Sequence, residues 1–247
     1  MGTGDGERAT GGEQFATTHW SVVLTAGEAS TPHAREALEK LCRLYWYPLY
    51  AYVRRQGRGP EEAEDLTQEF FTRLIAKNYL SAVDRRKGKF RSFLLAALEH
   101  FLAKQWVRAH AQKRGGRQVF VSFDDEDVET RYQLEKADEL TPEKIYDRRW
   151  ALTLLQQALA RLEAECADDS RRALFEQLKP LLSGEDSEAS YADIAARVGT
   201  TPGAVKVAMH RLRQRYGELL RAEVGHTVAR PEEVDDEIRH LLAALSG

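Results

Sequence analysis

The chain has 247 residues, of which 43% are hydrophobic and 30% are charged, a composition typical of a globular protein with a well-solvated helical surface. Its net charge of −3 means that any nucleic-acid site depends on local segregation of basic residues. Two cysteines, Cys42 and Cys166, are too few for a disulfide framework and fit a reducing cytoplasm. No apolar run approaches the roughly 20 residues of a membrane span, so we expect a cytoplasmic protein without one.

Helical periodicity dominates the first half of the chain, after a glycine-rich tail at residues 1–14 that we expect to be disordered. Apolar stripes predict helices from Ala34 to Arg55, from Pro60 to about Lys77 and from Phe90 to Gln112. Residues 15–117 would therefore form one small helical domain.

The end of the third predicted helix is basic, with aromatic residues interleaved. No acid occurs among residues 100–120, and Phe101 and Trp106 lie between the basic positions. Basic side chains follow phosphates and aromatic rings stack on unpaired bases, so the stretch suits a nucleic-acid strand. The alternative, aromatic core residues beside a solvated helix end, stays open at this point.

Residues 118–145 read as an acidic linker, in which Thr141-Pro142 interrupts the pattern. A short β-like run, QVFVSF, opens it at 118–123. A second domain would follow at residues 146–224, beginning with helices marked by Trp150, Leu152, Leu155, Leu159 and Leu162, and by Ala173–Leu182.

The stretch Ser190–Tyr216 predicts two short helices joined by a tight turn. Gly199 stands where the first helix would stop, and Thr201-Pro202 supplies a cap and a first-turn proline for the second. Apolar residues recur on one side of the second helix and basic residues on the other. This is the layout of a helix-turn-helix, although a helical hairpin with a solvated basic face would show the same pattern.

An acidic extension at residues 225–247 closes the chain. Pro231 would start a short helix with Val234, Ile238, Leu241 and Leu242 on one side, and we expect this helix to pack on the second domain. The sequence therefore predicts an all-α protein of two small helical domains joined by an acidic linker.

Three stretches, in this order, resemble the extracytoplasmic-function group of the sigma-70 family of bacterial RNA polymerase subunits. They are AEDLTQEFF at 63–71, GKFRSFLLAALEHFLAKQWVRAHAQKR at 88–114 and YADIAARVGTTPGAVKVAMHRLRQRY at 191–216. The resemblance covers about residues 34–115 and 148–222 and implies a sigma region 2-like bundle and a sigma region 4-like helix-turn-helix.

The first stretch resembles the family's polymerase-docking helix. The resemblance implies that Asp65, Gln68 and Glu69 make polar contacts with the β′ clamp helices, and that Phe71 packs at or beneath that surface. A solvated acidic helix face is the alternative reading of the same residues.

The second stretch resembles the promoter-melting helix, which holds the non-template strand of the −10 element. Its implied DNA-binding residues are Lys89, His100, Lys104, Arg108, Lys113 and Arg114, together with Lys87 in the basic loop just before it. The sequence departs from the family at two of them, because His100 stands where asparagine is usual and Lys104 where aspartate is usual.

The third stretch resembles the domain that recognises the −35 element. Its implied DNA-binding residues are Thr201, Lys206, His210, Arg211 and Arg213. Ala208 occupies a place where a polar or basic residue is common, which shifts weight to phosphate contacts and DNA shape.

The expected function is that of a sigma factor, which binds core polymerase (β′ clamp helices and β flap), recognises promoter DNA and assists its opening. The alternative is a sigma-like regulator that melts promoters poorly, because of His100 and Lys104, and depends on a partner. An anti-sigma or other regulatory protein is a further candidate partner. No catalytic motif, metal-ligand spacing or cofactor site is found, so an enzyme is not expected.

Overall fold

The computed structural model describes residues 32–76, 89–111, 129, 132–133, 140–166, 168–183 and 190–246. Every regular element in these ranges is a helix, which confirms the predicted all-α class. The helices are α2 (Pro32–Arg55), α3 (Pro60–Ala76), α4 (Phe90–Ala111), α6 (Pro142–Ala164), α7 (Asp169–Ser183), α8 (Tyr191–Val198), α9 (Pro202–Gly225), the 3₁₀ turn η2 (Pro231–Glu233) and α10 (Val234–Ser246). The predicted β-like run at 118–123 lies outside the described residues.

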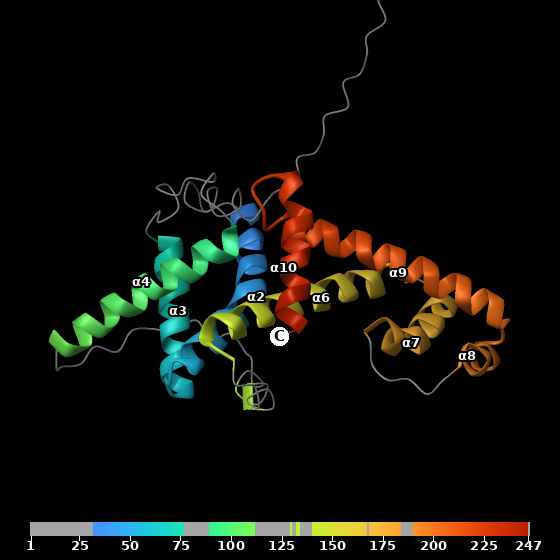
Figure 1. Cartoon of the computed structure of the whole chain (residues 1–247), viewed down its shortest axis with the longest axis horizontal. Coiled ribbons are helices and arrows are strands. Elements are labelled where there is room, and N and C mark those ends of the chain that lie inside the picture. Colours follow the sequence, from blue (N-terminus) through green and yellow to red (C-terminus); the bar gives the residue numbers. More distant parts are fainter. Residues whose placement is uncertain are drawn as a thin grey trace, which may run out of the picture.

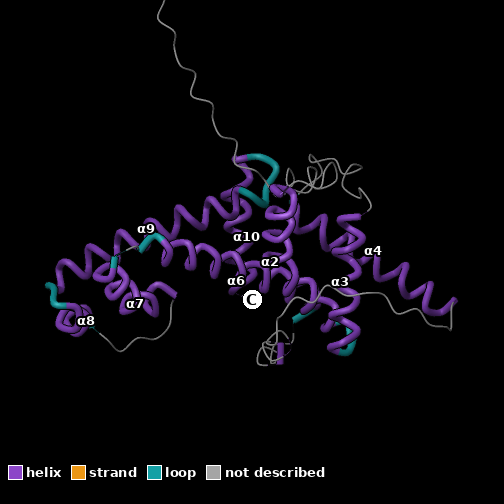
Figure 2. The backbone as a smooth tube through the Cα atoms, turned by 180° about the vertical axis from the view of Figure 1, so that it is seen from behind, coloured by secondary structure: helices purple, strands orange, loops and turns teal. Residues whose placement is uncertain are grey.

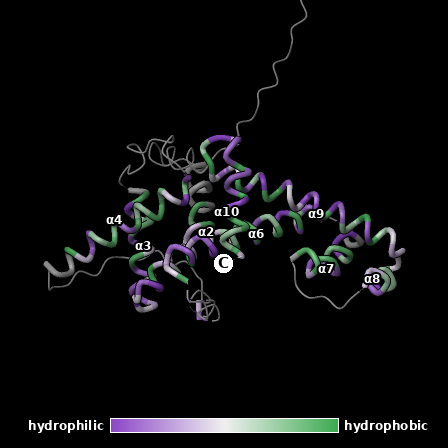
Figure 3. Tube along the Cα trace, in the orientation of Figure 1, coloured by the Kyte–Doolittle hydropathy of each residue, from purple (hydrophilic) through white to green (hydrophobic). Residues whose placement is uncertain are grey.

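The helices form an elongated molecule, in which α2, α6 and α10 lie at the centre (Figure 1). Helices α3 and α4 extend to one end, and α7 and α8 lie at the other, where α9 reaches from the centre. The view from behind shows the same arrangement (Figure 2). Hydrophobic and hydrophilic residues alternate along α9, as expected for a helix that is packed on one side (Figure 3).

The largest hydrophobic cluster joins the first and last parts of the chain. It takes side chains from α2, α3, α4, the N-terminal half of α6, the C-terminal end of α9 and the length of α10. Tyr45, Phe90, Trp150, Val224 and Leu241 are completely buried in it. Since each such side chain contributes about 1.5–3 kcal/mol on burial, this cluster is a main source of stability.

Two smaller clusters organise the other end. One contains Leu162 of α6, Phe175 of α7 and Leu219 of α9, and the other lies beneath α8. Helix α6 therefore contributes its first half to the central cluster and its second half to the outer part of the molecule.

Helix α6 begins four residues before Tyr146, inside the segment expected to be a linker. The Thr141 side chain accepts a hydrogen bond from the Lys144 backbone N–H, and Pro142 occupies the first turn. The Thr-Pro pair therefore starts a helix here and does not merely interrupt an irregular stretch. Ile145 and Tyr146 are already buried, so tertiary packing holds this first turn in place.

One acid of the expected linker pairs with α2. Arg54 donates to both carboxylate oxygens of Glu129, at 2.6 and 2.9 Å, and the Tyr50 hydroxyl donates to Glu129 Oε2 at 2.5 Å. The Arg54 guanidinium also lies over the ring of Tyr132, 4.8 Å from its centroid. This part of the acidic segment is therefore tied to the end of α2.

The C-terminal helix α10 packs against α6 and α9, as the sequence predicts. Its orientation differs in one detail, because Leu242 is 54% exposed while Glu237 is completely buried. Val234, Ile238 and Leu241 face the core as expected. The packed face is thus rotated toward the acidic side of the helix.

Glu237 is buried because it meets basic residues at the start of α4. Arg91 Nε donates to Glu237 Oε1 at 2.7 Å, and Lys89 pairs with the same carboxylate. Arg91 Nη1 also donates to Asp147 Oδ1 of α6 at 2.6 Å, and His240 Nε2 lies 3.1 Å from Asp147 Oδ2. Burial alone would lower the pKa of Arg91, but the two neighbouring carboxylates raise it overall, so this guanidinium stays charged.

Candidate nucleic-acid interface

The turn between α8 and α9 has the caps that the sequence predicts. The Ser190 side chain accepts from the Asp193 backbone N–H, and the Asp193 carboxylate accepts from the Ser190 backbone N–H, forming a capping box. Gly199 ends α8 with a φ of 70°, in the left-handed region that glycine adopts without strain. The Thr201 hydroxyl then accepts from Ala204 N–H at 3.2 Å and starts α9.

The two helices pack on a third, α7. Ile194 of α8 and Val205 and Met209 of α9 are buried against Leu178 of α7. This small core fixes which side of α9 faces inward. The predicted pair of helices with a tight turn is therefore present, and its apolar face is the predicted one.

The predicted contact residues of α9 all lie on the outer surface. Thr201, Lys206, His210, Arg211 and Arg213 are exposed. Within the part of the chain that the structure describes, none of the four basic side chains forms an ion pair. An exposed helix with uncompensated positive charge is suited to the phosphates and base edges of a DNA groove.

Arg215 gives the contrasting case on the same helix. It pairs with Glu165 at 2.7 Å and with Glu218 at 2.9 Å, and these contacts raise its pKa. Arg221, further along the helix, pairs with Asp235, so the uncompensated charge on α9 ends at Arg213. The rest of the helix serves to pack the unit onto α6, where Tyr216 donates to the Leu155 carbonyl at 3.1 Å.

The sequence pattern does not single out Val207, which the structure leaves 51% exposed among these residues. Only its spacing from Val205 could have predicted this exposure. It stands two positions after buried Val205, and so about 200° around the helix from it.

On α4, the second predicted DNA surface, only some of the predicted residues are exposed. His100 and Lys104 are exposed, and Trp106 is 55% exposed. Phe101 is instead buried, with Arg73 over its ring. Of the two aromatics considered for base stacking, only Trp106 therefore reaches the surface.

The remaining basic residues of this surface differ in their surroundings. Lys89 is held by Glu237 and is not free in this conformation. Arg108 lies on the last turns of α4, but the position of its side chain is not described. Lys87, Lys113 and Arg114 lie outside the described residues.

The predicted polymerase-binding residues lie along α3. Asp65 is exposed and Gln68 and Glu69 are half-buried, so all three reach one surface. Glu69 also accepts hydrogen bonds from Arg73 and from Gln105 of α4.

Phe71 lies beneath this surface, only 5% exposed. It stacks on Trp46 with ring centroids 5.6 Å apart. Its contribution is therefore to hold α3 against α2.

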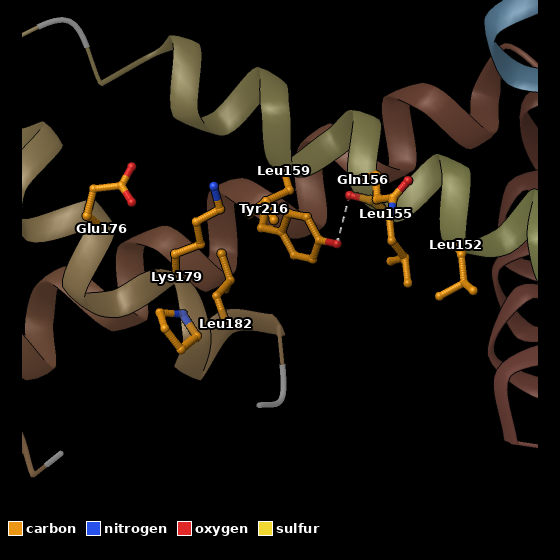
Figure 4. Close-up of a pocket in the computed structure, with 9 residues that line it drawn as sticks. Leu152, Leu155, Gln156, Leu159, Glu176, Lys179, Leu182 and Tyr216 are labelled. Carbon is orange, nitrogen blue, oxygen red and sulfur yellow. Dashed lines mark hydrogen bonds between the residues drawn. The ribbon is translucent and has the colours of Figure 1, made fainter. Parts of the chain in front are cut away.

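A cavity of about 630 Å³ lies between α6, α7 and α9 (Figure 4). Leu152, Leu155 and Leu159, which mark α6 in the sequence, line it together with Leu182 and Tyr216. The helix they predict is confirmed, but its fully buried side is the one that carries Tyr146, Trp150, Leu154, Ala158 and Leu162. The three leucines are half-buried and face the cavity instead.

Comparison with models of known protein families, with curated proteins and with solved structures finds no match. Among the described residues, no helix is both long and apolar enough to cross a membrane. The same residues contain no group of three or more histidine, cysteine, aspartate or glutamate side chains placed to hold a metal ion.

Proposed function

We propose that this chain is a promoter-specificity subunit of bacterial RNA polymerase, without catalysis of its own. It binds the core enzyme through α3, contacts two promoter elements through α9 and α4, and assists strand opening. The proposal places the protein in the cytoplasm, where bacterial transcription takes place.

The capped helix-turn-helix carries the proposal. Its second helix presents Lys206, His210, Arg211 and Arg213 on its exposed surface, without acidic partners among the described residues. In docked helix-turn-helix proteins this side of the second helix enters the major groove. The local charge compensates for the unfavourable net charge of −3 of the whole chain.

The arrangement of the molecule supports contact with two separate DNA segments. The outer end of α4 and the α8–α9 unit lie at opposite ends of the structure (Figure 1). Exposed Trp106 and Lys104 at one end suit an unpaired strand, whereas the helix-turn-helix suits a duplex. Different forms of DNA at the two ends are what promoter recognition with opening requires.

The exposed polar face of α3 supports docking on the polymerase. Asp65, Gln68 and Glu69 reach one surface, whereas Phe71 fixes the helix from below. Removal of the three polar side chains therefore changes the surface while leaving the aromatic packing beneath α3 in place.

The test is a pull-down of bacterial core RNA polymerase with the full chain. We expect the wild type to bind, and Asp65→Ala/Gln68→Ala/Glu69→Ala to lose at least about tenfold in affinity, or roughly 1.4 kcal/mol. The control variant Glu232→Ala/Asp236→Ala also removes two negative charges, but from exposed positions elsewhere in the chain, and should bind like the wild type. Equal binding by the triple variant and the wild type would contradict docking through α3.

Absence of binding by the wild type would contradict the proposal as a whole. Circular dichroism of each point variant distinguishes a lost contact from a lost fold.

A further inference from the structure

The centre of the outer face of α9 is occupied by an apolar side chain. Val207 is 51% exposed and stands about 200° around the helix from Val205, which is completely buried. It therefore points almost directly away from the small core formed with α7 and α8. Val207 is not among the side chains that form that core.

The neighbours of Val207 leave the space in front of it open. One turn earlier on the same face lie Gly203 and Ala204, both exposed, and nothing lies within 4 Å of a Cβ placed on Gly203. One turn later lie His210 and Arg211, also exposed. A flat surface could approach Val207 closely while the two longer side chains reach past it.

The chemistry of the major groove gives this arrangement a partner. Thymine is the one base of DNA that presents a methyl group there, and proteins detect it by apolar contact. Valine is branched at Cβ and strongly prefers one χ1 rotamer in a helix, so its methyl groups are held in place before binding. Single exposed apolar residues are common on protein surfaces, but this one lies at the centre of the helix face that carries the uncompensated charge.

We propose that Val207 is a specificity-determining residue that contacts the C5-methyl group of a thymine in the duplex bound by α9. This inference rests on the proposed function and deepens it. Arg211 and Lys206 hold the helix on the DNA, and Val207 makes one position of the bound sequence favour thymine.

The experiment starts from a pool of randomised duplex DNA, selected with the full chain alone and with the full chain bound to bacterial core RNA polymerase. Each thymidine of an enriched duplex is then replaced in turn by deoxyuridine, which lacks only the methyl group. Affinities are measured for the wild type, Val207→Ala and Val207→Ile, and for Lys206→Ala and Arg211→Ala as tests of DNA binding by α9. Alanine is a better helix former than valine, so Val207→Ala at this exposed site should fold.

For the wild type we expect one thymidine whose replacement lowers affinity about fourfold, the size that follows from losing one buried methyl group. Val207→Ala should bind the two duplexes equally, and about as weakly as the wild type binds the deoxyuridine duplex. Val207→Ile keeps an apolar branched side chain and should keep the preference for thymidine.

The outcomes separate this inference from the proposed function. If Lys206→Ala and Arg211→Ala weaken binding but no thymidine responds, or Val207→Ala responds like the wild type, DNA binding stands and the thymine contact is refuted. If neither selection enriches any duplex, both DNA recognition by α9 and the thymine contact of Val207 are refuted.

Discussion

Replacing Glu237 by alanine tests whether the C-terminal helix is an integral part of the fold. Glu237 is completely buried, and its carboxylate meets Arg91, whose side chain is 9% exposed, and Lys89, whose side chain is 29% exposed. The substitution removes one negative charge from the junction of α4, α6 and α10. It leaves Asp147 as the remaining acidic partner of Arg91 among the described residues.

The expected cost follows from the burial of the charges that remain. Breaking a buried ion pair by removing one partner destabilises a protein by about 3–5 kcal/mol, because the other charge is left without compensation. Arg91 keeps Asp147, and the Lys89 side chain can turn toward water. We therefore expect the lower end of that range, about 3 kcal/mol.

The assay is urea unfolding, followed in parallel by far-ultraviolet circular dichroism and by tryptophan fluorescence. Trp150, one of the four tryptophans that contribute to this signal, lies at the junction, with the Arg91 guanidinium 5.2 Å from the centroid of its ring. Coincidence of the two signals is needed before a single free energy of unfolding can be used.

Asp236→Ala is the matched control. It removes a carboxylate from the same helix, but from an exposed pair with Arg239, in which the side chains are 63% and 76% exposed. Exposed pairs contribute about 0–1 kcal/mol, so the control should change the free energy of unfolding little. Equal losses for Glu237→Ala and Asp236→Ala would refute the reasoning, because burial would then make no difference.

Two further predictions concern local contacts. Hydrogen bonds from Arg54 lower the pKa of Glu129 from its ordinary value of 4.5 to about 2, so the stabilisation by this carboxylate is complete above pH 4.5 and is lost as the pH falls toward 2. Glu129→Gln should thus be less stable than the wild type at neutral pH, and the gap should close over that window in urea titrations; a gap independent of pH would contradict this assignment. Ser190→Ala should cost about 1 kcal/mol in thermal unfolding and speed amide exchange in the first turn of α8, because Ser190 caps that helix; unchanged exchange there would show that the capping box is dispensable.

Two helix N-termini show how much of the fold can be predicted from the sequence. Thr201-Pro202 and Thr141-Pro142 are the same signal, a hydroxyl that caps and a proline in the first turn, and both begin a helix. At 201 the signal precedes a clear apolar stripe and predicts α9 correctly. At 141 it lies among acids, and the burial that makes the first turn of α6 helical comes from α2, which is distant in the sequence.

The face of α10 could be predicted only in part, for a related reason. Apolar spacing correctly assigns Val234, Ile238 and Leu241 to the packed side. It also assigns Leu242 to that side, although the structure exposes Leu242 and buries Glu237. An acid is inside because Arg91 meets it, and no local pattern in α10 contains that information.

The same limit decides which basic residues are available for DNA. Arg213 and Arg215 stand two positions apart on α9 and look alike in the sequence, yet Arg215 is held by Glu165, which is 50 residues away in the chain. Lys89 likewise counts as basic in the sequence, but Glu237 already compensates its charge. If Lys89 is to meet a phosphate, it has to exchange a buried carboxylate for it, whereas Arg213 gives up only water and mobile ions. Salt sensitivity of DNA binding should therefore come from residues such as Arg213, whose charge has no acidic partner in the described part of the chain.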